Sequence, residues 1–102
     1  MKNLVIIVHA NVQQDLADCL RDLRQVRGFT FSHAEGHGSP VDDDPFLSAR
    51  DRVVGYVPRI RVDVLLDDHD VDAVISAIGT ADCGVAGQGV YWVLPAEKPG
   101  RF

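Results

Sequence analysis

RIRVDVLL, residues 59–66, is the strongest strand pattern in this chain. Apolar and charged side chains alternate along it, which is typical of a strand that buries one face and exposes the other. The side chains expected on the buried face are Ile60, Val62 and Val64. A helix is predicted directly after this strand, because apolar residues recur at helical spacing beyond a candidate cap at Asp67 or Asp68. This helical stripe consists of Val71, Val74, Ile75 and Ile78.

The first half of the chain repeats this organisation. KNLVIIVHA, residues 2–10, is a continuous apolar run typical of a central strand. Asn11 is the expected N-cap of the helix that follows. FTFSHAEG, residues 29–36, alternates as a second strand, and GVYWVL, residues 89–94, is predicted to be the last strand. The apolar stripe of the first helix consists of Val12, Leu16, Cys19, Leu20 and Leu23.

The predicted order is therefore strand, helix, strand, strand, helix, strand, which is the ferredoxin-like βαββαβ arrangement of the α+β class. We expect residues 1–102 to form a single domain, with a long loop at about 39–54 and a C-terminal tail at about 95–102. Two helices can cover only one face of a four-stranded sheet. The other face is therefore expected to pack against further subunits.

Composition excludes several classes of function. Ten basic and fifteen acidic residues give a formal net charge of −5, which argues against a nucleic-acid partner. No segment has the length of a membrane span or the features of a signal peptide, so a cytoplasmic location is predicted. The two cysteines, Cys19 and Cys83, form no CxxC motif and no zinc spacing, and reduced thiols are expected. No catalytic triad, carboxylate pair or cofactor motif is recognisable, so the protein is not predicted to be an enzyme.

A glycine-rich segment precedes the last predicted strand in TADCGVAGQGVYWV, residues 80–93. Glycines allow backbone amides to approach a phosphate closely. Here they follow a predicted helix and precede a predicted strand, which is the reverse of the dinucleotide-binding motif, and no Lys or Arg stands beside them. The spacing of the glycines alone is compatible with both a tight turn and an anion-binding site. The glycines are Gly84, Gly87 and Gly89.

The two middle strands are connected through GHGSPVDDDPFLSARDRVVGYVP, residues 36–58. This connection is far longer than a β-hairpin loop requires. The segment combines an acidic run with an apolar tip. It is a candidate partner-binding loop, and the alternative is an insertion whose apolar tip folds back onto its own domain. The candidate partner-binding residues are Asp42, Asp43, Asp44, Phe46 and Leu47.

Histidines suggest an alternative function, a metal-binding sensor or chaperone. His33 and His37 flank the start of the long loop. Imidazole together with carboxylate suits divalent transition metals such as zinc, nickel or copper. In an extended strand the two side chains would share a face but lie about 13 Å apart. They would therefore meet around one metal only across a subunit interface.

The order of elements and several short motifs resemble the PII signal-transduction superfamily. These motifs are EGHG before the long loop, YVPRIRVDV after it, the aspartates before the second helix, and the glycine-rich segment. GHG and SARDRVVG look most like a group of small PII-like proteins whose genes are often found beside heavy-metal efflux pumps. The resemblance extends to about Pro95. It implies a homotrimer whose long loop controls a membrane transporter, such as a heavy-metal efflux pump, or an enzyme.

The resemblance also implies an adenine nucleotide site in the clefts between subunits. In PII proteins the amides of the glycine-rich loop hold the phosphates. Nucleotide-binding members have a lysine where this chain has Val90, and their later pair of arginines is replaced by a tail with only Lys98 and Arg101. Weak nucleotide binding is therefore expected, because each missing charged hydrogen bond forgoes about 1.5 to 3 kcal/mol. The residues that the resemblance assigns to this site are Thr30, Gly38, Arg59, Asp63, Gly87, Gln88, Gly89 and Val90.

Overall fold

The predicted order of strands and helices is present in the computed structural model, which describes residues 1–37, 56–81, 83–85, 87 and 89–102. The ferredoxin-like α+β fold is thereby confirmed. Within these ranges no helix is both long enough and apolar enough to cross a membrane. The strands are β1 (Lys2–His9), β2 (Thr30–Gly36), β3 (Val57–Leu66) and β4 (Val90–Pro95). The helices are α1 (Gln13–Arg21) and α3 (Val71–Thr80), preceded by the short 3-10 helices η1 (Ala10–Val12) and η3 (Asp68–Asp70).

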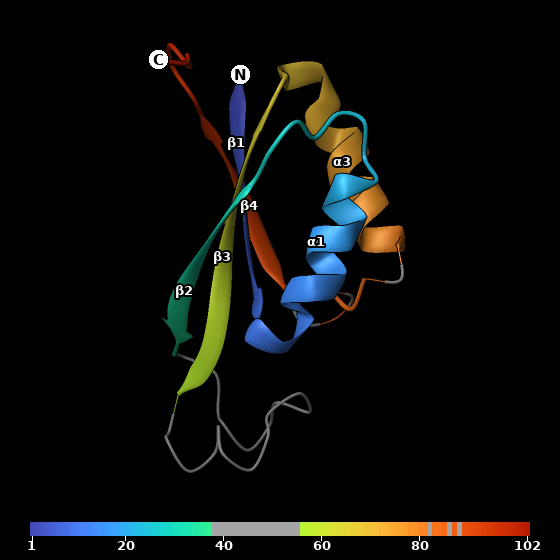
Figure 1. Cartoon of the computed structure of the whole chain (residues 1–102), viewed down its shortest axis with the longest axis vertical. Coiled ribbons are helices and arrows are strands. Elements are labelled where there is room, and N and C mark those ends of the chain that lie inside the picture. Colours follow the sequence, from blue (N-terminus) through green and yellow to red (C-terminus); the bar gives the residue numbers. More distant parts are fainter. Residues whose placement is uncertain (38–55, 82, 86, 88) are drawn as a thin grey trace.

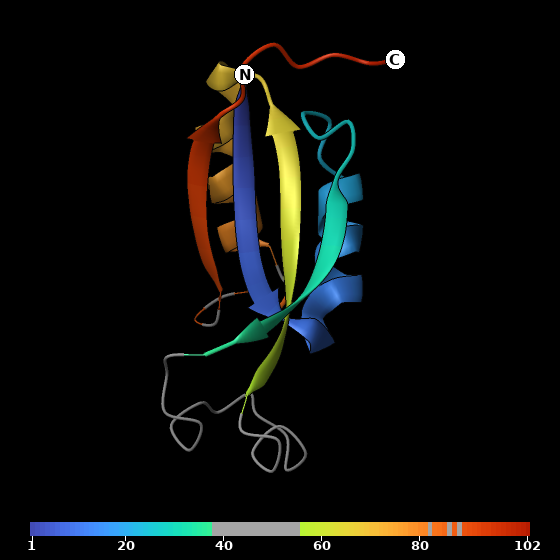
Figure 2. The same ribbon diagram turned by 90° about the vertical axis from the view of Figure 1, so that its left-hand side faces the viewer.

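The strands form one antiparallel sheet in the order β2-β3-β1-β4 (Figure 2). β1 and β3, which carry the clearest strand patterns in the sequence, lie at its centre. In the register of the sheet, Ile6 of β1 lies opposite Val62 of β3 and Tyr91 of β4, and Phe31 of β2 also lies opposite Val62. β2 and β4 form the two edges of the sheet.

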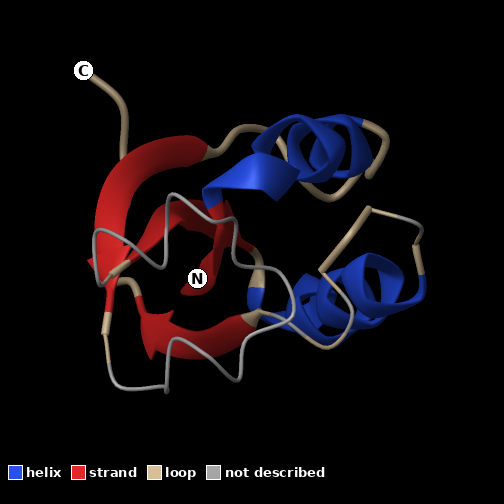
Figure 3. Ribbon diagram, turned by 90° about the horizontal axis from the view of Figure 1, so that it is seen from below, coloured by secondary structure: helices blue, strands red, loops and turns tan. Residues whose placement is uncertain are grey.

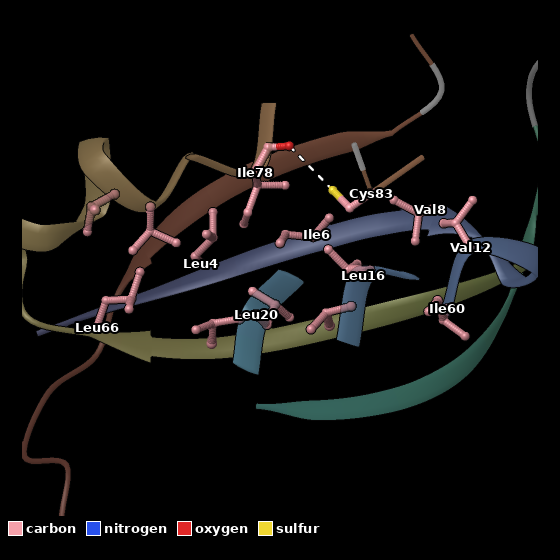
Figure 4. Close-up of a cluster of buried hydrophobic side chains, with 14 residues drawn as sticks. Leu4, Ile6, Val8, Val12, Leu16, Leu20, Ile60, Leu66, Ile78 and Cys83 are labelled. Carbon is pink, nitrogen blue, oxygen red and sulfur yellow. Dashed lines mark hydrogen bonds between the residues drawn. The ribbon is translucent and has the colours of Figure 1, made fainter. Parts of the chain in front are cut away.

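Both helices cover the same face of the sheet (Figures 1 and 3). The core lies between them and this face, and it is built from alternate residues of β1 and β3 together with one side of each helix (Figure 4). The predicted buried face of residues 59–66 is confirmed, since Ile60, Val62 and Val64 are all fully buried. The buried cluster consists of Leu4, Ile6, Val8, Val12, Leu16, Leu20, Ile60, Val62, Val64, Leu66, Val71, Val74, Ile78 and Cys83.

The predicted helix caps were wrong in detail. His9, rather than Asn11, caps the first helical turn, because its Nδ1 accepts a hydrogen bond from the Asn11 backbone N–H at 3.0 Å. Asn11 itself lies inside η1. Asp67 occupies the cap position of η3 without a side-chain cap hydrogen bond. The Asp68 carboxylate instead contacts the N-terminal amine of Met1 at 3.1 Å, which lowers the pKa of Asp68.

Candidate functional site

The face of the sheet opposite the helices changes character from one edge to the other. Over β2 and β3 it is polar, and Arg61 and Asp63 lie on it because they alternate with core residues along β3. Over β4 it is apolar and open to solvent, with Val90 58%, Trp92 40% and Leu94 43% exposed. Exposed apolar edge strands are uncommon in proteins that act alone, so this region is a candidate contact surface.

Asp63 lies at the centre of a hydrogen-bonded group on the polar part of this face. Arg61 donates from Nε to Oδ2 at 3.1 Å and from Nη2 to Oδ1 at 3.0 Å. The Asn3 amide donates to Oδ1 at 3.0 Å, and Thr30 of β2 lies opposite Asp63 in the sheet register. The hydrogen bonds from Arg61 lower the pKa of Asp63, and the hydrogen bond from Asn3 acts in the same direction. Asp63 is therefore a carboxylate at neutral pH that accepts hydrogen bonds.

A broad, open cavity of about 850 Å³ lies beside this group. Thr30 and Asp63 line it, and Arg27 and Arg101 contribute positive charge. Part of its wall comes from the C-terminal tail, so residues from both ends of the chain meet here. A cavity that combines cations with a carboxylate acceptor suits a ligand that carries both phosphate and hydrogen-bond donors.

The glycine-rich loop lines a different cavity, an apolar one of about 220 Å³ between α3 and β4. Gly87 has a φ of +78°, a backbone conformation that favours glycine, and an added Cβ would meet nothing within 4 Å. Gly89 is more restricted, because an added Cβ would lie 3.0 Å from Val8 Cγ1. Val90, the first residue of the edge strand β4, borders this cavity as well as the open face of the sheet, and it stands where a cation would follow the glycines.

The structure therefore divides the predicted nucleotide-binding residues into two groups. Thr30 and Asp63 line the polar cavity, whereas Gly87, Gly89 and Val90 line the apolar one, and no described residue lines both. The two cavities lie on opposite faces of the sheet, since the apolar cavity is bounded by core residues of β1 and the polar one by residues of the open face. A single subunit does not bring the two groups together.

Other predicted site residues lie apart from these groups or outside the described ranges. Arg59 lies against β2, because an added Cβ at Gly36 would be 2.8 Å from Arg59 Nε. Gly38 and Gln88 lie outside the described residues. The same holds for the candidate partner-binding residues Asp42, Asp43, Asp44, Phe46 and Leu47.

The two histidines of the metal hypothesis lie in the middle of β2 and just beyond its end. His33 is exposed and lies opposite Ile60 of β3. His37 follows the end of β2, and its Nε2 lies 3.3 Å from the Glu35 Oε2 atom. Its ring centroid lies 6.2 Å from that of Tyr56. Neither histidine belongs to a group of three or more candidate metal ligands among the residues that the structure describes.

A different set of metal-ligand side chains gathers where β3 leads into α3. Potential donor atoms of Asp67, His69 and Asp70 all lie within 4.8 Å of one another. The run DDHD at residues 67–70 places a histidine among carboxylates, but this group was not predicted from the sequence as a metal site. Arg24 and Arg27 line a cavity together with Asp67 and Asp70, so positive charge lies near the same carboxylates.

The architecture defines the class of fold: a four-stranded antiparallel sheet in the order β2-β3-β1-β4 with two helices on one face is a ferredoxin-like α+β fold (Figure 1). The chain belongs to the family described as "Protein of unknown function (DUF3240)", which matches residues 1–102. The predicted membership of the PII-like superfamily is confirmed.

Named relatives and a solved structure agree with this assignment. The chain is 25% identical over 103 residues to a "Nitrogen regulatory protein P-II" of Azospirillum brasilense, covering 100% of this chain and 91% of the relative. It is 27% identical over 99 residues to the protein of the same name from Rhizobium meliloti (strain 1021), covering 96% and 88%. A crystal structure of a DUF3240 family protein from Shewanella baltica OS155 matches with a TM-score of 0.76 at 18% sequence identity, covering 99% and 94%.

Proposed function

We propose that this chain is a cytoplasmic PII-like regulatory protein rather than an enzyme. It works as a homotrimer, binds an adenine nucleotide weakly between subunits, and controls a membrane transporter or an enzyme through its long loop. The similarity to nitrogen regulatory proteins supports the regulatory role. The observation that carries the proposal is the division of the candidate nucleotide residues into two groups on opposite faces of the sheet.

Each group suits one part of a nucleotide. The ionised Asp63 carboxylate can accept a hydrogen bond from an amino group of the base, with Thr30 beside it. The backbone around Gly87 can approach a phosphate closely. Arg101 and Arg27 are the cations of the polar cavity. A complete site forms when the glycine-rich loop of one subunit meets the polar cavity of its neighbour.

The exposed apolar residues of β4 supply a contact surface for such an assembly. All six residues of β4 are exposed, on both faces of an edge strand. Burying this strand against a neighbour removes apolar surface from water and protects an open sheet edge. A heterologous contact between copies produces a closed trimer when each copy is rotated by one third of a turn from the next, and this is the geometry that the proposal requires.

Calorimetry of the purified protein with ATP, ADP, AMP and cyclic AMP tests nucleotide binding directly. We expect weak binding of at least one of them, and loss of it in both Asp63→Ala and Gly87→Val. Binding that survives both substitutions would place the nucleotide elsewhere. If no nucleotide binds the wild-type protein, the nucleotide part of the proposal is wrong. This result would not contradict the regulatory role of the long loop.

Mixing subunits then tests whether each site is shared. Neither variant alone has an intact cleft, but in randomly mixed trimers of Asp63→Ala and Gly87→Val about a quarter of the clefts combine two intact halves. Partial recovery of binding is expected after the two variants are unfolded and refolded together. The control is the same treatment of each variant alone. No recovery in mixed trimers would show that one subunit supplies the whole site.

A second candidate function is a metal sensor or chaperone linked to heavy-metal efflux, and the grouping of Asp67, His69 and Asp70 favours it. Imidazole nitrogen with carboxylate oxygen suits divalent zinc, nickel or copper. Titration with each metal ion should show binding that His69→Ala removes and His33→Ala leaves intact. The reverse pattern would move the site to the start of the long loop, and no binding would remove this candidate.

A further inference from the structure

Two short connections at one end of the sheet carry opposite charges that border a common space. Residues 22–29 join α1 to β2, and residues 67–70 join β3 to α3, both at the end of the sheet where β3 ends (Figure 1). Together they line a cavity of about 320 Å³, called the charged cavity below. Its lining residues are Arg24, Gln25 and Arg27 from the first connection and Asp67 and Asp70 from the second.

The core holds the backbone on both sides of the charged cavity. In the first connection Leu23 and Val26 pack against the core, and the Val26 backbone N–H donates to the Leu23 carbonyl at 3.1 Å. The second connection lies between two buried residues, Leu66 and Val71. A backbone hydrogen bond of 3.0 Å also joins its last residue to its first. The charged side chains therefore project from two segments whose positions are fixed by packing.

The opposite charges do not pair with each other across this space. Among the residues that the structure describes, Arg24 and Arg27 form no ion pair, and the side chain of Asp67 accepts no hydrogen bond. The Asp70 carboxylate is only 23% exposed, and its ionic contact is a histidine nitrogen at 3.5 Å on a side chain that is 82% exposed. Partly buried carboxylates that lack a close cationic partner gain free energy when a cation binds them.

This combination of charges favours a ligand that carries both a negative and a positive group. A simple anion would be attracted by the guanidinium groups but repelled by the carboxylates, and the reverse holds for a simple cation. A molecule with one group of each sign gains both attractions when it lies in the right orientation. The volume of about 320 Å³ is at the lower end of the range typical of small-molecule pockets, so the ligand should be small.

We propose that the charged cavity binds a free α-amino acid, whose carboxylate is held by Arg24 and Arg27 and whose ammonium group is held by the two aspartates. The guanidinium groups donate to the carboxylate oxygens, and the ammonium group donates to the aspartate oxygens. This site is distinct from the candidate metal group, because His69 does not line the charged cavity. It shares only Arg27 with the polar cavity of the nucleotide proposal.

NMR titration of the ¹⁵N-labelled protein with each common L-amino acid tests this proposal, with EDTA present so that no metal ion takes part. We expect at least one amino acid to bind at millimolar concentration or below and to shift the backbone amide signals of both Gln25 and Asp70. Two analogues of that amino acid, the amine without its carboxylate and the carboxylic acid without its ammonium group, should bind at least about tenfold more weakly. Each analogue loses the charged hydrogen bonds on one side of the cavity.

Charge-removing substitutions test the two sides of the cavity separately. Arg24→Gln and Asp70→Asn should each weaken binding of the amino acid at least about tenfold. The matched controls are Arg21→Gln and Asp72→Asn, because these exposed residues do not line the cavity, and both variants should bind like the wild-type protein. His69→Ala should also retain binding, whereas the metal hypothesis expects this variant to lose metal. Circular dichroism confirms that each variant is folded.

Three results would overturn the proposal. One is that no amino acid shifts the signals on both sides of the cavity. Another is that the amine or the carboxylic acid analogue binds as tightly as the amino acid, which would indicate a site for a simple cation or anion. The third is amino-acid binding that either Arg24→Gln or Asp70→Asn leaves unchanged. None of these results bears on the nucleotide proposal, because calorimetry with ATP measures nucleotide binding separately.

Discussion

Alanine substitution at three glycines should change stability in three different ways. Gly87 has a φ of +78° with open space around its Cα, so Gly87→Ala should cost only the strain of a left-handed backbone, about 1 to 2 kcal/mol. Gly89→Ala places a Cβ 3.0 Å from Val8 Cγ1 and 3.5 Å from the Ile7 carbonyl oxygen. Crowding of this kind in a packed region costs about 1 to 3 kcal/mol.

Gly79 provides the matched control. It lies in α3, an added Cβ would meet nothing within 4 Å, and its φ is not in the left-handed region. Gly79→Ala should therefore stabilise the protein, by up to about 1 kcal/mol, because alanine is the better helix former. The three substitutions add the same methyl group, so their different signs and sizes report the local backbone and packing alone.

Urea denaturation measures all three changes, and it is done at one fixed protein concentration because the stability of the proposed trimer would depend on concentration. In a domain of this size, 1 kcal/mol corresponds to about 4 to 8 °C in Tm. A neutral Gly87→Ala together with a destabilising Gly79→Ala would refute the assigned backbone conformations. Calorimetry with ATP on the folded Gly87→Ala variant then measures the effect on binding separately from the effect on stability. Binding should weaken, because the added methyl group hinders a phosphate from reaching the backbone amide.

Four further substitutions test other parts of the structure. Leu16→Ala empties a fully buried site in the core and should cost about 2 to 5 kcal/mol in urea denaturation. Asp63→Asn should lower the free energy of unfolding by on the order of 1 kcal/mol at neutral pH. Because folding lowers the pKa of Asp63, the wild-type protein has its full stability advantage over this variant above the unfolded-state pKa of about 4. The advantage should disappear as the pH falls through the pKa of Asp63 in the folded protein. Trp92→Glu puts a charge on the apolar part of β4 and should shift light scattering from trimer to monomer, and an unchanged trimer would exclude this surface as the contact. Val90→Lys supplies a cation beside the glycines and should tighten ATP binding at least about tenfold in calorimetry. Unchanged binding would indicate that the glycine-rich loop is a turn and not a phosphate site.

The strands and helices could be predicted from the amino-acid sequence, because the patterns that specify them are local. The alternation in residues 59–66 identified the buried side of β3 correctly, since successive side chains of a strand must point to opposite faces. The stripe from Val71 to Ile78 identified α3 in the same way. The order of these elements was then enough to predict the ferredoxin-like arrangement.

Which distant residues lie together could not be predicted from the sequence, because it depends on how the strands pair and the helices pack. Thr30 lies opposite Asp63 because β2 pairs with β3 in one particular register, which no local pattern reports. Gly87 is separated from both because β4 joins the other edge of the sheet. Contacts between remote residues follow from the path of the whole chain, and periodicity within a short segment carries no information about that path.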